Sequence, residues 1–298
     1  MRNQGSSTWR WGIALAMAAA GLTAGTTAAA AVASPGQRAP VQAVSAAAQQ
    51  ASRALWTPAR MAAATPLADA TPSPPPGIPS PTHFTGVPTV GALFFTTGSQ
   101  QHFCTASVVD SPTANLVLTA AHCVYGSSYA RNIEFVPRYH DGLQPFGAWA
   151  VRSITVAAGW RTSHDPSLDF AFLTVSPPPG THRPIQQVTG GLRLGIDAGY
   201  RHRIEVIGYN NGEDAPIKCA TRSFRFGTGQ MEFYCNDFQD GTSGGPWIIG
   251  FGPQAGTGTV FGVIGGYEEG GDYPWASYSV YFGPPTLKLY WQAELQQL

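Results

Sequence analysis

A serine stands among glycines in Asp240-Gly241-Thr242-Ser243-Gly244-Gly245-Pro246, between two runs that read as β-strands. Glycine adopts positive φ freely and lets the backbone approach a ligand closely, so this setting is more typical of an exposed nucleophile than of core packing. A serine hydroxyl is a poor nucleophile by itself and needs a general base that a third group holds in place. The chain upstream of Ser243 therefore has to supply a base and an acid.

The candidate base is His122, in the run Leu118-Thr119-Ala120-Ala121-His122-Cys123. The small alanines let neighbouring segments pack behind a histidine that faces outward. A histidine beside a cysteine is, taken alone, more typical of a structural residue. Cys104 lies 19 positions earlier on the preceding strand-like run. A Cys104–Cys123 disulfide would fix the turn that carries the histidine and stabilise the fold by about 3 kcal/mol.

The candidate acid is Asp169, at the mouth of the apolar run Phe170–Leu173. A buried carboxylate without a partner costs several kcal/mol. An imidazole N–H would make its burial tolerable and would fix the tautomer of the ring. Asp165 is the alternative, but it stands beside Pro166 in what reads as a solvated turn, so the sequence favours Asp169.

The order of these residues excludes two other serine-hydrolase arrangements. The segment Gly241–Gly245 also satisfies G-x-S-x-G, but an α/β-hydrolase places its histidine after the serine, and the last histidine here is His202. A subtilisin-like order needs the acid before the histidine. The acids before it are Asp69, in a proline-rich region, and Asp110, in a turn only 12 positions upstream.

Three motifs of the chain resemble those of trypsin-like serine peptidases with the chymotrypsin fold: Thr119–Cys123, Asp169–Leu173 and Gly241–Pro246. The resemblance covers about residues 84–298. It implies an all-β fold class, with two six-stranded antiparallel β-barrels, an active site in the crevice between them and a C-terminal helix. About a dozen short strand-like runs, from Val90–Thr96 to Ser277–Tyr281, agree with this fold. The tail Pro285–Leu298 reads as the helix.

The same resemblance implies roles for the site residues. His122 is expected to be the general base, Asp169 to orient it and Ser243 to attack, with the N–H groups of Gly241 and Ser243 as the oxyanion hole. Thr242 stands where zymogen-activated members carry an aspartate that pairs with a new N-terminal ammonium. Threonine cannot form that ion pair, so we expect that the mature N-terminus does not assemble the oxyanion hole.

The chain is more similar to secreted bacterial members of the family, including the glutamyl-endopeptidase-like branch. Thr242, the Cys219–Cys235 pair and Gly208-Tyr209 carry that similarity. The glutamate-specific branch uses a histidine on the strand after the serine. Residues 260–281 contain no histidine, so a preference for glutamate is disfavoured.

The acidic residues near Ser243 in the sequence could determine which substrate side chain the pocket selects. Asp237 lies six positions before Ser243, the offset of the acid with which trypsin selects Arg or Lys. Asp240, Glu268 and Glu269 are equally plausible pocket acids, and all four could instead be solvated loop charges. A preference for basic residues is the hypothesis that these acids motivate.

The opposite wall of the pocket is expected in Gly262–Tyr267. Gly265 and Gly266 would leave backbone groups bare for an extended peptide to pair with. Tyr267 could narrow the entrance, and Phe238 could line the pocket. Both aromatics could equally be simple turn residues.

Composition divides the chain into three parts. Residues 1–33 read as a secretory signal, with Arg2 and Arg10 before an apolar run. Residues 34–83 are rich in Ala and Pro and are expected to be a disordered propeptide or linker, with a weak helix possible over Ala46–Ala64. Residues 84–298 form the expected peptidase domain. The 17 basic and 17 acidic residues cancel, which speaks against a nucleic-acid partner or an anionic membrane surface.

The sequence therefore predicts a secreted, extracellular and monomeric serine endopeptidase that acts on proteins or peptides through an acyl-enzyme. We expect no cofactor, no metal and no stable membrane association. Four cysteines fit two disulfides in an oxidising compartment, and no Cys/His cluster has zinc-ligand spacing. Two alternatives stay open: a catalytically silent homologue that acts as a binding protein, and a hydrolase of ester substrates on the same fold.

Overall fold

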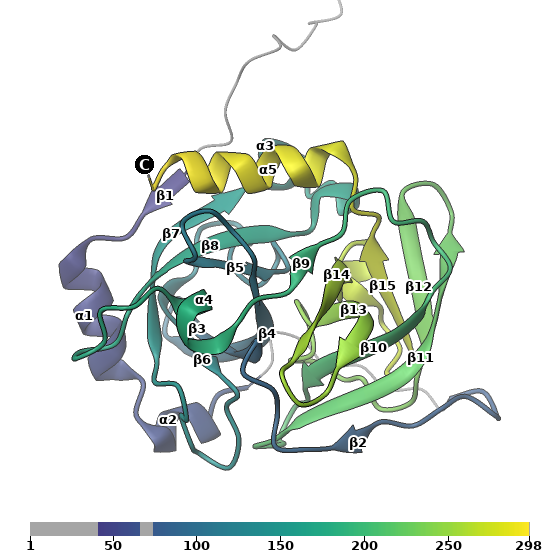
Figure 1. Cartoon of the computed structure of the whole chain (residues 1–298), viewed down its shortest axis with the longest axis horizontal. Helices are drawn as coiled ribbons and strands as arrows, with labels where there is room; N and C mark the ends of the chain where they lie inside the picture. Colours follow the sequence, from purple (N-terminus) through teal and green to yellow (C-terminus); the bar gives the residue numbers. More distant parts are fainter. Residues whose placement is uncertain (1–40, 66–73, 298) are drawn as a thin grey trace, which may run out of the picture. The chain divides into compact units, whose positions relative to one another are not determined.

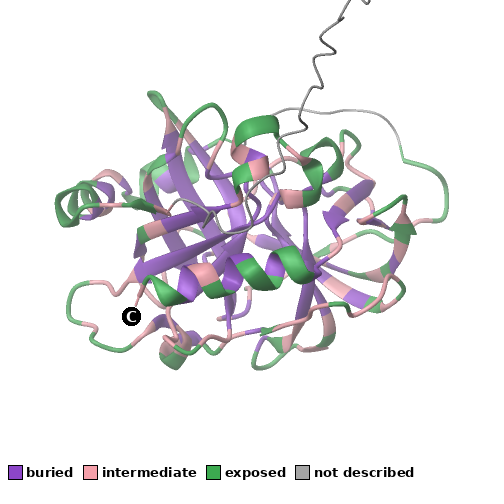
Figure 2. Cartoon of the chain, turned by 90° about the horizontal axis from the view of Figure 1, so that it is seen from above, coloured by how far each residue is buried: buried purple, intermediate pink, exposed green. Residues whose placement is uncertain are grey.

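A computed structural model of the chain describes residues 41–65 and 74–297. The expected signal over residues 1–33 lies outside the described residues. Figure 1 shows two sheets side by side, with the C-terminal helix α5 (Pro284–Leu295) running past them. The strands of both sheets are largely buried in Figure 2, whereas α5 exposes one side.

The first sheet closes into a six-stranded antiparallel barrel. Its strands follow the order β7-β6-β3-β4-β5-β8, and β8 pairs back with β7. Their bounds are β3 (Val90–Thr97), β4 (Gln100–Val109), β5 (Leu116–Thr119), β6 (Arg131–Pro137), β7 (Trp149–Val156) and β8 (Ala171–Ser176). Apolar side chains fill the interior, among them Leu93, Trp149 and Leu173, each with no exposed surface. The barrel thus holds the ends of β5 and β8, which carry the candidate base and acid.

The second sheet has six antiparallel strands in the order β15-β12-β11-β10-β13-β14. They are β10 (Arg203–Tyr209), β11 (Pro216–Phe226), β12 (Gln230–Tyr234), β13 (Pro246–Gly252), β14 (Thr257–Val263) and β15 (Ala276–Val280). Two short strands extend it: β9 (Arg193–Leu194) pairs with β14, and β2 (Thr82–His83) pairs with β11.

This sheet departs from the expected closed second barrel. No ladder joins β14 to β15 in the described chain. The Ser279 hydroxyl accepts a hydrogen bond from the Val263 N–H at 2.9 Å instead, and the Gly265 N–H donates to the Tyr278 carbonyl at 3.0 Å. The Ser279 side chain therefore accepts a hydrogen bond that a backbone carbonyl would accept if β14 and β15 formed a ladder.

The helices that connect the strands are short, whereas α5 at the C-terminus is longer. α3 (Ala158–Ser163), α4 (Ile185–Thr189) and the 3₁₀ turns η1 (Pro166–Leu168) and η2 (Tyr267–Gly270) connect strands. α5 packs through Leu289, Tyr290 and Ala293, and the Tyr290 hydroxyl donates to the Asp110 carbonyl at 3.0 Å. This helix begins at the predicted place and covers an edge of the core.

Residues 41–65 lie inside the segment expected to be disordered, yet they are ordered in the structure. They form β1 (Val41–Ala43), α1 (Ala46–Leu55) and α2 (Pro58–Ala62), and together we call them the N-terminal arm. Ser45 caps α1, and Thr57 caps α2, which has Pro58 at its first turn. β1 pairs antiparallel with β7, so packing against the barrel orders a segment whose composition alone would not fold.

Two disulfides join the predicted pairs, Cys104–Cys123 and Cys219–Cys235. The first ties β4 to the turn after β5, and the second ties β11 to the end of β12. In the described ranges, no helix combines the length and the apolar character needed to cross a membrane.

Candidate active site

His122 lies in a tight turn directly after β5. Its predecessors Ala120 and Ala121 have no exposed surface, as the small side chains predicted. The Ala121 carbonyl accepts hydrogen bonds from the N–H groups of Val124 and Tyr125 at 3.0 and 2.8 Å. With the Cys104–Cys123 disulfide, these bonds fix the turn, and the histidine keeps only 6% of its surface exposed.

Asp169 is fully buried between η1 and β8, and three N–H groups surround its carboxylate. The His122 backbone N–H donates to Oδ1 at 2.9 Å, and the His122 Nδ1 lies 2.8 Å from Oδ2. The Gly266 N–H also donates to Oδ2, at 2.8 Å. A proton on Nδ1 satisfies this geometry and leaves the lone pair of Nε2 free to accept another. The alternative acid, Asp165, instead caps η1 by accepting from the Ser167 N–H.

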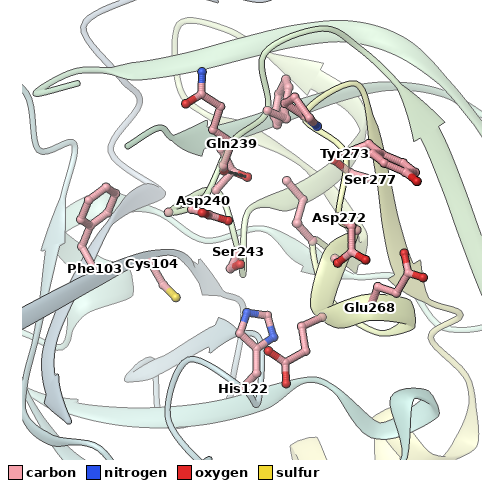
Figure 3. Close-up of a pocket in the computed structure, with 18 residues that line it drawn as sticks. Phe103, Cys104, His122, Gln239, Asp240, Ser243, Glu268, Asp272, Tyr273 and Ser277 are labelled. Carbon is pink, nitrogen blue, oxygen red and sulfur yellow. Dashed lines mark hydrogen bonds between the residues drawn. The ribbon is translucent and has the colours of Figure 1, made fainter. Parts of the chain in front are cut away.

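Ser243 sits in a loop that is fastened on both sides. The Thr105 N–H donates to the Ser243 carbonyl at 2.7 Å, and the Gly244 N–H donates to the Ile264 carbonyl at 2.7 Å. Gly244 has φ +78°, and a Cβ there would lie 2.2 Å from the Thr105 carbonyl oxygen, so only glycine fits. Figure 3 shows Ser243 next to the His122 ring. No hydrogen bond links the two side chains in the described part of the chain, and such bonds are often long before substrate binds.

Gly241 places a second N–H group beside that of Ser243. Its φ is +95°, and its carbonyl accepts from the Thr105 hydroxyl at 3.0 Å. Neither the Gly241 N–H nor the Ser243 N–H donates to another described residue. Both donors are therefore available to an oxygen atom bound near Ser243. Thr242, the residue between them, donates its hydroxyl to the Gln239 carbonyl at 2.7 Å and so has a local partner.

The charges around His122 favour its protonated form. Burial works to lower the pKa of His122, but the Asp169 carboxylate opposes it by charge and by hydrogen bonding. Glu269 and Asp240 add to the same effect, and the net result is a pKa raised above 6.5. The ring is thus suited to take up a proton and release it near neutral pH.

A cavity of about 310 Å³ opens beside His122 and Ser243. Four acids line it: Asp240, Glu268, Glu269 and Asp272. No lysine or arginine is found among its described lining residues. Figure 3 shows Asp272, Glu268 and Tyr273 on one side of Ser243, with Phe103 and Cys104 on the other. The cavity therefore carries a concentration of negative charge.

The structure places some predicted pocket residues elsewhere. Asp237 is exposed, has φ +62° and does not line the cavity. Phe238 does line it, with 4% of its surface exposed. Asp272, which is also an exposed residue, does line the cavity. It follows Gly270 and Gly271, whose φ values of +117° and +116° turn the chain back toward the cavity.

Gly265, Gly266 and Tyr267 are not part of the lining. The N–H groups of both glycines are occupied, by the Tyr278 carbonyl and the Asp169 carboxylate, so they are not bare for a peptide as expected. The Tyr267 ring instead meets that of Tyr278 edge to face, with the ring centroids 5.0 Å apart. These residues support the acid: a Cβ on Gly265 would lie 3.0 Å from Asp169 Oδ2.

The sequence reasoning missed two residues of β4, Phe103 and Thr105. Phe103 lines the cavity, and Thr105 bonds to both Gly241 and Ser243. Their position on either side of Cys104 was the available signal, because a cysteine that fixes the histidine turn must bring its neighbours close to the site.

Donor atoms of Cys104, His122 and Cys123 lie within 4.8 Å of one another, the spacing of a metal site. The two cysteines are joined in a disulfide, so neither offers a thiolate. These three residues do not fit a metal.

Comparisons with known proteins concern the family and the fold of the chain. The family model described as Trypsin matches residues 80–280. A search of curated proteins found no match to the chain. Among solved structures, the protease Anisep from Arthrobacter nicotinovorans has a TM-score of 0.64 at 24% identity, covering 72% of this chain and 99% of its own.

Two further structures are similar. The thermostable serine protease AL20, from an extremophilic microorganism, has a TM-score of 0.62 at 26% identity and covers 70% of this chain and 97% of its own. A Glu endopeptidase has a TM-score of 0.57 at 18% identity and covers 74% of this chain and 99% of its own. At that identity, the likeness to the Glu endopeptidase concerns the fold alone.

Proposed function

The chain belongs to the trypsin family of serine peptidases, and on this basis we propose that it is a secreted endopeptidase that acts through an acyl-enzyme. One observation carries the proposal: a buried carboxylate fixes His122 by two hydrogen bonds, and Ser243 lies beside this ring in an open cavity. We also propose that β10–β15 act as the second barrel of the family. The two disulfides fit the oxidising conditions outside a cell.

The proposed chemistry is acyl transfer. Ser243 Oγ attacks the carbonyl carbon of the scissile bond while its proton moves to Nε2 of His122. The carbonyl oxygen becomes an oxyanion, and the N–H groups of Gly241 and Ser243, which donate to no described residue, would donate to it. The C–N bond then breaks, and the proton on His122 passes to the leaving amine. A water molecule then attacks the acyl-enzyme ester in the same way, with His122 again accepting and returning the proton. This releases the acid product and free Ser243.

Asp169 would act through His122 rather than on the substrate. Its carboxylate holds Nδ1 protonated, which keeps Nε2 toward the nucleophile and stabilises the imidazolium that forms. The bond from the Gly266 N–H keeps the carboxylate itself in place. These hydrogen bonds satisfy a fully buried carboxylate beside a ring that changes charge.

We propose that the cavity selects basic side chains. Asp240, Glu268, Glu269 and Asp272 line it, and a lysine or arginine entering it would meet complementary charge. A peptide-library cleavage profile tests this. Asp272→Asn should weaken the preference for Arg and Lys, whereas Asp237→Asn, at an exposed position outside the cavity, is the matched control. A wild-type profile that peaks at large apolar residues would exclude the preference.

The activity itself is tested by an irreversible fluorophosphonate. The wild-type protein should be labelled on Ser243, and Ser243→Ala should fold normally but lose both labelling and activity by several orders of magnitude. A homologue that only binds partners would not be labelled. Parallel assays on casein and on a simple ester separate a peptidase from an esterase on the same fold.

A further inference from the structure

The N-terminal arm ends against the strand that borders the candidate active site. The Thr65 N–H donates to the Gln101 carbonyl at 3.2 Å, and the Phe103 N–H donates to the Thr65 carbonyl at 3.3 Å. β4 pairs with β5 only over Ser107–Val109, so Thr65 covers a stretch of its edge that β5 leaves free. The last residue described in the arm is thus bonded to the backbone of a cavity-lining residue.

The arm is anchored well before it reaches this edge. Trp56 is 4% exposed, and its indole N–H donates to the Asn132 carbonyl at 2.6 Å. Its ring lies 5.3 Å from that of Phe94, between centroids. Met61 in α2 is 2% exposed. Burying two large apolar side chains is typical of a permanent part of a fold rather than of a loose tether.

Phe103 lies between the arm and Gly241, which precedes the nucleophile by two positions. On one side, its ring shares a buried cluster with Trp56, Met61 and Ala64. On the other side, a Cβ added to Gly241 would lie 2.3 Å from Cε2 of the Phe103 ring. The ring therefore rests directly on the backbone of Gly241, and the arm packs behind it.

We propose that the N-terminal arm is retained in the active enzyme and positions the oxyanion hole, by holding the Phe103 ring against Gly241. This inference rests on the proposed role of the Gly241 N–H. It assigns to residues 41–65 a supporting role, in place of the removable propeptide or linker that the composition suggested. Met61 is a positioning residue in this arrangement, since it acts through Phe103 and not on the substrate.

A blocking role for the arm fits the structure less well. No residue of the arm lines the cavity, whose lining begins in the chain at Phe103. An inhibitory segment would have to enter the cavity or cover Ser243, and the described arm does neither.

The test uses the full chain with Met61→Ala, which removes packing behind Phe103. Because losing one oxyanion donor lowers kcat by about 10² to 10³, a displaced donor should lower it by at least about tenfold. KM should stay within about twofold. Met61→Leu should restore kcat. Leu289→Ala is the matched control, since it truncates a buried side chain of α5 that belongs to a different hydrophobic cluster from Phe103. Met61→Val serves as a milder change should the alanine variant not fold.

Two further readouts complete the test. Each folded variant is assayed well below its own melting temperature, and the rate of fluorophosphonate labelling should fall together with kcat. N-terminal sequencing of the secreted active form should find residues 41–65 present. Equal kcat in Met61→Ala and Leu289→Ala, or a fully active form that begins after residue 65, would overturn the inference alone. A wild-type protein that neither cleaves peptides nor reacts at Ser243 would overturn the proposed function, and this inference with it.

Discussion

Replacing Glu134 with glutamine should make the protein more stable at alkaline pH. Glu134 on β6 has no exposed surface, and neither carboxylate oxygen has a hydrogen-bond partner of normal geometry in the described chain. Burial raises its pKa from the ordinary 4.5 to about 7, although Ser52 and Arg53 of α1 work in the opposite direction. The Arg53 guanidinium donates to the Pro177 carbonyl at 3.2 Å, so it does not fully compensate the acid.

The direction and the size of this change in stability follow from the linkage between proton binding and folding. Between pH 4.5 and about 7, Glu134 is ionised in the unfolded chain and protonated in the folded one. The folded state then binds more protons, so stability falls as pH rises through this window. The rise from 4.5 to about 7, at about 1.4 kcal/mol for each unit of pKa, amounts to roughly 3 kcal/mol. This stabilisation is complete below pH 4.5 and lost above about pH 7.

Urea unfolding of the wild type and of Glu134→Gln at pH 4 and at pH 8 measures this effect. The difference in unfolding free energy between the two proteins should change by roughly 3 kcal/mol in favour of glutamine at the higher pH. All other ionisable groups are shared by the two proteins and cancel. Glu268→Gln, at an exposed position, controls for the loss of one charge. A difference that is the same at both pH values would refute the reasoning.

Three shorter predictions concern the site and the disulfides. The activity of the wild type should rise with pH through a midpoint above 6.5. Glu269→Gln should lower that midpoint, because Glu269 raises the pKa of His122. A Glu269→Gln variant with the pH–rate profile of the wild type would contradict this. Gly265→Ala should reduce kcat by at least about tenfold by displacing Asp169. A variant with the kcat of the wild type would contradict this prediction. Serine at both positions of the Cys219–Cys235 pair should cost about 3 kcal/mol of unfolding free energy, and unaltered urea unfolding argues against a stabilising role.

The residues that could be predicted are those whose role is set by their immediate neighbours in the sequence. Ala120 and Ala121 are fully buried behind His122, and Gly244 takes a backbone conformation that only glycine tolerates. Cys104 and Cys123 followed from order and spacing, and their disulfide is present. In each case the residue type itself indicates the local geometry: alanine allows close packing, glycine allows a positive φ and cysteine allows a disulfide. These inferences need no knowledge of the rest of the fold.

Side-chain direction in loops could not be read this way. Asp237 has the right offset from Ser243, but it lies outside the cavity, which Asp272 lines instead. The open edge of the second sheet depends on one hydroxyl, that of Ser279, replacing a backbone acceptor. Neither the acid that lines the cavity nor the open sheet edge can be predicted from a periodic pattern in the sequence. Each depends on contacts with a segment that is distant in the chain.

The sequence indicated a weak helix over Ala46–Ala64, where α1 and α2 lie, but not that this segment packs on the barrel, for a related reason. Helix α1 buries the polar residues Gln49 and Ser52, while the large apolar anchor Trp56 lies just outside its end. The buried side of α1 is therefore polar, so the sequence indicated only a weak helix and gave no apolar face that would pack on the barrel. Gln49 is nonetheless satisfied, because its side chain accepts from the Ser176 hydroxyl at 2.7 Å and donates to the Val44 carbonyl at 2.9 Å. Hydrogen bonding to the barrel takes the place of an apolar face.

Strand β4 explains why the arm and the nucleophile loop are structurally linked. Successive side chains of a strand point to opposite faces, so Phe103 and Thr105 share one face and Cys104 takes the other. The shared face meets Gly241 twice: the Phe103 ring rests on its backbone, and the Thr105 hydroxyl donates to its carbonyl. The opposite face carries the disulfide to Cys123, next to His122. A shift of β4 would therefore move the donor loop and the base together, and the arm, bonded to the same strand at Phe103, opposes that shift.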